Sequence, residues 1–366
     1  MDVSFLAPVF NAAGPYATVC ADVTHTSENA DTELELRVRA ITEELTGQGA
    51  PESVVETVRS QLLQANEGGR LGTLRGRALV VAADGTVVLD EALADAPRDP
   101  VSRWSPTPDL LPVLRQLAGR VPHVVVVVDG DGADISVAGG TGQQAATRQA
   151  EFGGGAHHTR VASAEDQWEH DAERIAAQLR DVVLRTGARF VLLAGDVRAR
   201  TLLADKVGKE VSEVLVSIEE GGRGAGADRS VIDDRAAELI AENEAAESAR
   251  VLEQVQAASA HGLAVTGTAL VVEALRKAQV ETLVLADQPD DDEELYAGPG
   301  ELELGLSTED VAALGVTDAR RVPAGLGMLR AAVGSDAAVV VVPRAGMPGD
   351  IPVAAVLRYT DASTPS

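Results

Sequence analysis

The sequence contains a single cysteine, and aromatic residues make up only 2% of its 366 residues. One thiol, Cys20, excludes an intramolecular disulfide and a cysteine-rich zinc site, and this usage is typical of a reducing compartment. Because aromatic side chains are few, the hydrophobic cores have to be built mainly from Val, Leu and Ala. This composition favours α/β layers.

Long apolar runs and a basic leader are also missing. A membrane-spanning helix needs about 20 consecutive apolar residues, and no stretch of the sequence approaches that length. The segment from Met1 to Gly14 has no basic flank before its short apolar run, so it does not resemble a signal peptide. We therefore expect a cytoplasmic protein that makes no membrane contact.

Positive charge is scarce, and the formal net charge is −26. With such a charge we expect no DNA binding. Nonspecific RNA binding is also disfavoured, because each phosphate contact needs a cation. Basic residues nevertheless gather in two intervals. The first contains Arg70, Arg75 and Arg77; the second, a candidate for RNA or partner binding, contains Arg198, Arg200, Lys206 and Lys209. Solvated helix faces are the alternative interpretation of both intervals.

The chain is too long for one ordinary core, so we predict an α/β protein with three domains. The first, residues 1–120, combines two helical patterns (31–45 and 51–66) with a hairpin whose strands cover 77–82 and 86–89. Proline residues between 97 and 112 indicate an irregular connector. It leads into a short helix near Leu110 to Leu117.

The second domain, residues 121–260, begins with five consecutive valines, Val124 to Val128, which predict a strand buried on both faces. A return strand, 133–137, precedes a glycine-rich stretch, 139–159, that shows no regular period. Further on, the pattern predicts a helix from Ser163, strands at 190–193 and 214–218, a helix at 197–207 and a long acidic helix at 230–259. The third domain, residues 261–366, is a further α/β unit.

Three stretches resemble the archaeal and eukaryotic release factor and Pelota family. Residues 262–287 read GLAVTGTALVVEALRKAQVETLVLAD, residues 349–359 read GDIPVAAVLRY, and residues 188–195 read ARFVLLAG. The first two are similar to the helix–strand junction and the terminal strand of that family's C-terminal domain. The third is similar to a strand of its central domain, so the resemblance covers 124–359.

This resemblance implies a central RNase H-like domain and a C-terminal α/β sandwich like that of a ribosomal RNA-binding protein. It also implies a monomer that binds rRNA in the ribosomal A site. Position alone places the N-terminal domain at the decoding centre. The implied partner besides the ribosome is a translational GTPase related to elongation factor Tu. Short bacterial relatives, some of which act on idle or stressed ribosomes, are the most similar subgroup.

Release factors of this family hydrolyse peptidyl-tRNA with a Gly-Gly-Gln loop, in which glycines allow close approach and the glutamine segment positions water. The corresponding interval here contains Gly153, Gly154, Gly155, His157, His158 and Arg160, and no glutamine follows the glycines. Pelota proteins also lack this glutamine and still occupy the A site. We therefore expect an rRNA- or tRNA-binding loop without catalytic residues, in a protein that is not an enzyme.

The histidines leave an alternative open. His157 and His158 could contact phosphates together with Arg160, or act in acid–base chemistry. Adjacent side chains diverge and no third ligand is suitably spaced, so we expect no metal site. Because neither a dinucleotide fingerprint nor a Walker motif is present, we expect no cofactor.

Three hypotheses for function follow. The first is a noncatalytic A-site protein of stalled or hibernating ribosomes. The second is a peptidyl-tRNA hydrolase that acts through the loop from Gly153 to Arg160. The third is a stress-related protein that binds a small ligand or a protein and never contacts RNA. The acidity of the chain favours the third hypothesis.

Overall fold

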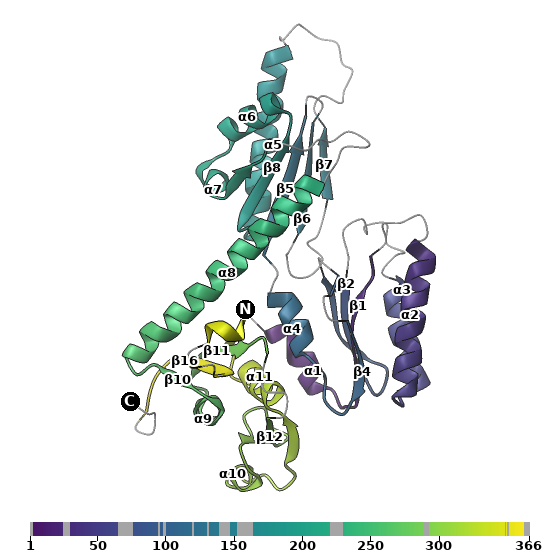
Figure 1. The fold of residues 1–366 in the computed structure, drawn as a ribbon, viewed down its shortest axis with the longest axis vertical. Coiled ribbons are helices and arrows are strands. Elements are labelled where there is room, and N and C mark those ends of the chain that lie inside the picture. Colours follow the sequence, from purple (N-terminus) through teal and green to yellow (C-terminus); the bar gives the residue numbers. More distant parts are fainter. Residues whose placement is uncertain are drawn as a thin grey trace. The chain divides into compact units, whose positions relative to one another are not determined.

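The computed structural model describes residues 3–24, 30–64, 76–93, 96–97, 100–118, 121–129, 132–138, 147–151, 164–219, 230–288, 293–347, 349 and 351–361. It confirms the α/β class (Figure 1). The chain forms two compact units, one of Met1–Ala118 with Ala245–Ser366 and one of Gly119–Glu244. The limits of the three predicted domains stay a prediction.

The first part of the chain forms a four-stranded antiparallel sheet in the order β3-β2-β1-β4. Its strands are β1 (Tyr16–Asp22), β2 (Gly76–Ala82), β3 (Val87–Leu93) and β4 (Val101–Ser105). Helices α2 (Ala30–Gly47) and α3 (Glu52–Gln64) pack on one face, where they meet Ala17, Val19 and Ala21 of β1. Tyr16 and Cys20 face the other side, as the two-residue period of a strand requires.

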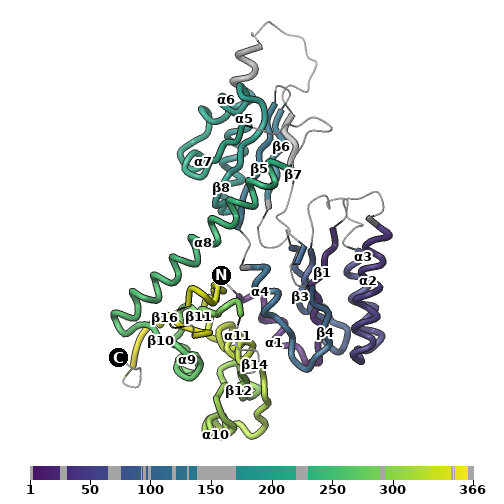
Figure 2. Tube along the Cα trace, in the orientation of Figure 1, coloured from purple at the N-terminus to yellow at the C-terminus, as the bar shows by residue number. Residues whose placement is uncertain are grey.

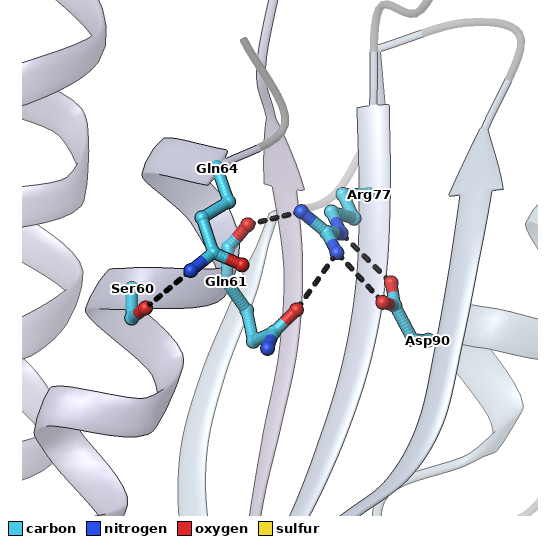
Figure 3. A network of polar contacts seen from close by, with 5 residues as sticks. All are labelled: Ser60, Gln61, Gln64, Arg77 and Asp90. Carbon is cyan, nitrogen blue, oxygen red and sulfur yellow. Dashed lines mark hydrogen bonds and ion pairs between the residues drawn. The ribbon is translucent and has the colours of Figure 1, made fainter. Parts of the chain in front are cut away.

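A polar network ties α3 to the adjacent strands (Figure 3). Arg77 of β2 forms a two-point ion pair with Asp90 of β3, with Nε–Oδ1 at 2.7 Å and Nη2–Oδ2 at 2.6 Å. The same guanidinium donates to the backbone oxygen and to Oε1 of Gln61 in α3. Arg77, one of the residues in the first basic interval, is therefore a structural residue with a side chain only 15% exposed.

Two strands of this sheet were not expected. The predicted irregular connector at 97–112 contains β4, whose Ser102 and Trp104 pair with Val19 and Ala17 of β1. Strand β1 carries no sequence signal of alternation, because its first six residues are all buried. Short helical segments η1 (Ser4–Leu6) and α1 (Ala7–Asn11) precede β1, and α4 (Leu111–Ala118) follows β4.

The last part of the chain belongs to the same unit. Its trace runs from green to yellow in Figure 2. It forms a four-stranded mixed sheet, β10-β16-β11-β15, from β10 (Ala264–Thr266), β11 (Val280–Ala286), β15 (Ala338–Val342) and β16 (Val353–Leu357). Leu283 and Leu285 face α9 (Thr268–Arg276) and α11 (Ala324–Gly334). Val284 packs against Val251 of α8 (Ser230–Ala260) on the other face. This is the α/β sandwich that was predicted.

A small three-stranded sheet is inserted between β11 and α11. It consists of β12 (Glu294–Ala297), β13 (Leu304–Gly305) and β14 (Arg320–Pro323) in the order β13-β12-β14. A capping box between Ser307 and Asp310 begins the short helix α10 (Thr308–Ala312). A second 3-10 turn, η2 (Arg344–Gly346), lies after β15. None of these strands was predicted.

The second unit contains a five-stranded sheet in the order β7-β6-β5-β8-β9, with β5 antiparallel to β6 and parallel to β8. Its strands are β5 (His123–Val128), β6 (Gly132–Ala138), β7 (Thr147–Glu151), β8 (Phe190–Gly195) and β9 (Leu215–Ser217). Strand β7 lies within the stretch 139–159, for which the sequence shows no regular period. The order and directions are those of the RNase H-like sheet that was predicted.

Helices cover both faces of this sheet, which explains the valine run. Val124, Val126 and Val128 pack against α5 (Ala164–Thr186) and α6 (Val197–Lys206). Val127 packs on the other face against Ile232 and Leu239 in the first half of α8. A four-residue helix, α7 (Lys209–Ser212), precedes β9. Within the described ranges, no helix combines the length and apolar character that crossing a membrane requires.

Candidate nucleic-acid interface

The predicted RNA-binding loop lies outside the described residues. This applies to all six of its candidates, Gly153, Gly154, Gly155, His157, His158 and Arg160. The elements on either side of the loop are β7, an outer strand of the five-stranded sheet, and α5, which packs on one face of that sheet. The role of the loop stays a prediction.

The second basic interval lies on α6 and α7, directly after β8. Helix α6 begins at Val197 because Asp196 caps it, with Oδ1 accepting hydrogen bonds from the backbone nitrogens of Arg198 at 3.0 Å and Ala199 at 3.1 Å. Lys206 occupies the last turn of α6, where a cation complements the helix dipole. Asp196 and Lys206 therefore contribute to the stability of α6 itself.

Acidic residues accompany the other cations of this interval. Lys206 forms an ion pair with Glu173 of α5 at 3.0 Å, and Lys209 forms a longer one with Glu213 at 3.6 Å. Arg180 approaches from α5 and pairs with Glu210 at 2.8 Å, and this hydrogen bond lowers the pKa of the Glu210 carboxyl. Between 196 and 213 the chain holds as many acidic as basic residues, so this surface has no net positive charge.

Arg200 does not join the exposed cations. Its side chain is turned into the unit, and the residue is only 8% exposed. Nε donates to the backbone oxygen of Gly195 at 3.0 Å, and Nη1 donates to Oγ of Ser217 at 2.9 Å. The helical spacing could have indicated this burial, since Arg200 lies three residues before Leu203, a buried residue on the same face of α6. The structure therefore separates Arg200 from Arg198, Lys206 and Lys209.

The partners of Arg200 lie at one edge of the sheet. Strands β5, β8 and β9 run parallel, so their carboxyl ends meet there. At Gly195 the chain bends with φ +114°, and the nitrogen of Asp196 donates to the oxygen of Val128 at 2.9 Å. A Cβ on Gly195 would lie 1.9 Å from that same oxygen. Only glycine fits this close approach between β5 and β8.

No group of three or more His, Cys, Asp or Glu residues in the described part of the chain could hold a metal ion. His157 and His158 lie outside the described residues, so the expectation that they hold no metal ion stays a prediction.

Comparison with known proteins gives one family. Residues 122–261 match bacterial archaeo-eukaryotic release factor family 2, a range that contains the whole five-stranded sheet. None of the curated proteins matches this chain.

Solved structures give weaker likenesses. Archaeoglobus fulgidus Pelota is 18% identical, with a TM-score of 0.39 over 78% of this chain and 80% of that one. S. cerevisiae Dom34, a translation termination-like factor, is 12% identical, with a TM-score of 0.41 over 79% of this chain and 80% of that one. An archaeal translation termination factor, aRF1, is 14% identical, with a TM-score of 0.24 over 97% and 96%. These scores are too low to carry an argument about function.

Proposed function

We propose that this chain, whose residues 122–261 match bacterial archaeo-eukaryotic release factor family 2, is a ribosome-associated translation factor. In this proposal it binds the A site of stalled or hibernating ribosomes in the cytoplasm. The observation that carries the proposal is the agreement between the family match and the sheet. The matched range contains an RNase H-like sheet with the glycine-rich segment between β7 and α5, the interval that corresponds to the Gly-Gly-Gln loop of release factors.

The proposed contact with ribosomal RNA is the segment from Gly153 to Arg160. Three consecutive glycines place no side chains between the backbone and RNA, and Arg160 with the two histidines supplies donors for phosphate oxygens. A net charge of −26 requires that such a contact be local. Its affinity should fall with added salt according to the few phosphates that it neutralises.

The proposed role is binding without hydrolysis. Water attack on a peptidyl-tRNA ester requires a positioned water, and the glycines at 153–155 are not followed by the glutamine that does this in release factors. A hydrolase that uses His157 or His158 as a general base is the second candidate. The observation that favours it is the adjacent pair of imidazoles, since histidine is the side chain that most often serves as a general base.

The cations Arg198, Lys206 and Lys209 are proposed as a contact for a protein partner, the translational GTPase that the family resemblance implies. Paired charges favour a protein over RNA, because a charge-balanced surface gains little from contact with a polyanion. Val197, which is 65% exposed at the start of α6, adds an apolar contact. Arg200 is not part of this surface, since its side chain is buried.

One assay separates the candidates. The purified chain is added to ribosomes that carry peptidyl-tRNA in the P site, and both pelleting and peptide release are measured. The proposal predicts pelleting without release above the spontaneous rate. Release that disappears in His157→Ala/His158→Ala would support the hydrolase. A chain that neither pellets nor releases peptide would instead support a stress protein that never contacts RNA.

A further inference from the structure

Arg200 is only 8% exposed, and no carboxylate of the described residues forms an ion pair with its guanidinium. It forms no ion pair with any residue that the structure describes, and its two hydrogen-bond acceptors, the oxygen of Gly195 and Oγ of Ser217, are both neutral. Asp196, the adjacent acidic residue, uses its carboxylate to cap α6. Arginine is charged at every pH at which a protein folds. Among the described residues, Arg200 is therefore a fixed cation without a carboxylate counterion.

Burying such a charge is unfavourable unless an anion compensates it. Two hydrogen bonds occupy two of the five N–H groups of the guanidinium, and Nη2 forms none with a described residue. Nη1 and Nη2 together present the paired donors that bind two oxygens of one phosphate. The unused donors thus have the geometry for an oxyanion.

The location also fits a ligand. Arg200 reaches the carboxyl ends of β8 and β9, the edge at which open α/β sheets bind their ligands. Ser217 is exposed at the end of β9, so this edge is accessible to solvent. Its Oγ accepts a hydrogen bond from Arg200, which leaves the hydroxyl proton free to be donated to an anion.

We propose that Arg200 and Ser217 form a binding site for a phosphate group at the carboxyl edge of the five-stranded sheet. Nη1 and Nη2 of Arg200 bind two phosphate oxygens, and the Ser217 hydroxyl donates to one of them. The group is either a phosphodiester of an RNA backbone or a free phosphate or nucleotide, because the chemistry that binds them is the same. This inference stands independently of the proposed ribosome binding.

The test measures binding to the isolated chain, without ribosomes. The first arm titrates inorganic phosphate and follows the melting temperature against sodium chloride at equal ionic strength. The second arm titrates a short single-stranded RNA without terminal phosphates and follows fluorescence anisotropy. The proposal predicts saturable binding in at least one arm, weakened by about tenfold or more in Arg200→Gln, as expected for the loss of charged hydrogen bonds. The arm that responds identifies the source of the phosphate.

Arg185→Gln is the matched control, since it removes one exposed cation of the same unit, paired with Asp181 at 2.9 Å, and leaves the sheet edge intact. Its affinity should equal that of the unchanged chain. Ser217→Ala keeps Arg200 in place and should weaken binding several-fold, which preserves the test if Arg200→Gln does not fold. No binding in either arm, or equal binding by Ser217→Ala and the unchanged chain, would overturn the proposal.

Discussion

Gly195 and Val128 lie at the carboxyl ends of two parallel strands, and the space between them excludes any side chain. A Cβ on Gly195 would lie 1.9 Å from the backbone oxygen of Val128, and φ at Gly195 is +114°. This contact allows Asp196 to donate its N–H to the same oxygen and then to cap α6. The position of Arg200 and the edge of the sheet therefore depend on a glycine.

Replacing Gly195 should be severe. We expect Gly195→Ala to lower the free energy of unfolding by about 4 kcal/mol or more, because a steric clash with backbone adds to the cost of positive φ. Gly187→Ala is the control, since Gly187 also has positive φ, +62°, but no atom lies within 4 Å of the added Cβ. It should cost about 1 kcal/mol. Urea denaturation followed by circular dichroism measures both, and equal losses would contradict the steric account.

The ion pair between Arg77 and Asp90 should contribute more to stability than an exposed pair. Its side chains are 15% and 37% exposed, whereas those of Arg39 and Glu43 in α2 are 74% and 65% exposed. A double-mutant cycle with Arg77→Gln and Asp90→Asn should give a coupling energy of about 1–2 kcal/mol. The same cycle at the exposed pair of Arg39 and Glu43 should give a smaller coupling energy, because solvent screens that pair. Coupling energies of equal size at the two sites would show that burial and two-point geometry do not strengthen the ion pair.

Gln48 protects the outer edge of strand β4. Its Nε2 donates to the oxygen of Ser102 at 3.0 Å and its Oε1 accepts from the nitrogen of Trp104 at 2.6 Å, so the side-chain amide satisfies two backbone groups as a neighbouring strand would. We expect Gln48→Ala to destabilise the chain by about 1–2 kcal/mol. Gln48→Glu should cost at least as much, since it retains the acceptor and loses the donor.

Thermal denaturation at pH 7 measures both variants at Gln48. Gln64→Ala is the control, because Gln64 makes an exposed contact with Ser60 of its own helix and none that the structure records with a strand. It should change stability by no more than about 0.5 kcal/mol. If Gln48→Ala behaves like Gln64→Ala, the amide does not protect the edge.

The Cys20 thiol should make the chain sensitive to alkaline pH. Burial raises the pKa of this thiol from 9.0 to about 11. The unfolded thiol loses its proton first, so its contribution is fully present below pH 9 and declines as pH rises toward 11. The stability of the unchanged chain should therefore fall faster between these values than that of Cys20→Ala, by up to about 1.4 kcal/mol per pH unit.

Urea denaturation at pH 8, 9, 10 and 11 measures this difference, in which titrations common to both chains cancel. Parallel pH profiles would show that the thiol titrates alike in the folded and unfolded states. The same burial predicts slow reaction of Cys20 with thiol reagents under native conditions and rapid reaction in denaturant.

The elements that the sequence predicted have strong local signals. The run Val124–Val128 could be identified as a strand buried on both faces, because valine occupies the positions that point to each face. The structure has helices packed on both sides of it. Strand β1 gave no such signal. Its residues Ala17 and Ala21 have low strand propensity, and its burial follows from contacts with distant strands β2 and β4.

The candidate site was only partly predictable for the same reason. Charge and spacing identified α6 as a basic helix, but they could not reveal that Arg200 points toward Ser217, seventeen residues later, because that contact depends on the pairing of β8 with β9. Likewise, the ion pair of Lys206 depends on α5 packing beside α6. Long-range contacts decide which cations are available, and a single sequence does not specify them.

Binding to ribosomes with an empty or an occupied A site tests the central proposal most directly. The chain is mixed with 70S ribosomes that carry P-site tRNA, with or without A-site tRNA, and pelleting is measured at physiological salt. The account predicts saturable binding to the empty A site, loss of binding when tRNA fills it, and weaker binding by His157→Ala/His158→Ala/Arg160→Ala. Equal binding to both kinds of ribosome, or none to either, would contradict it.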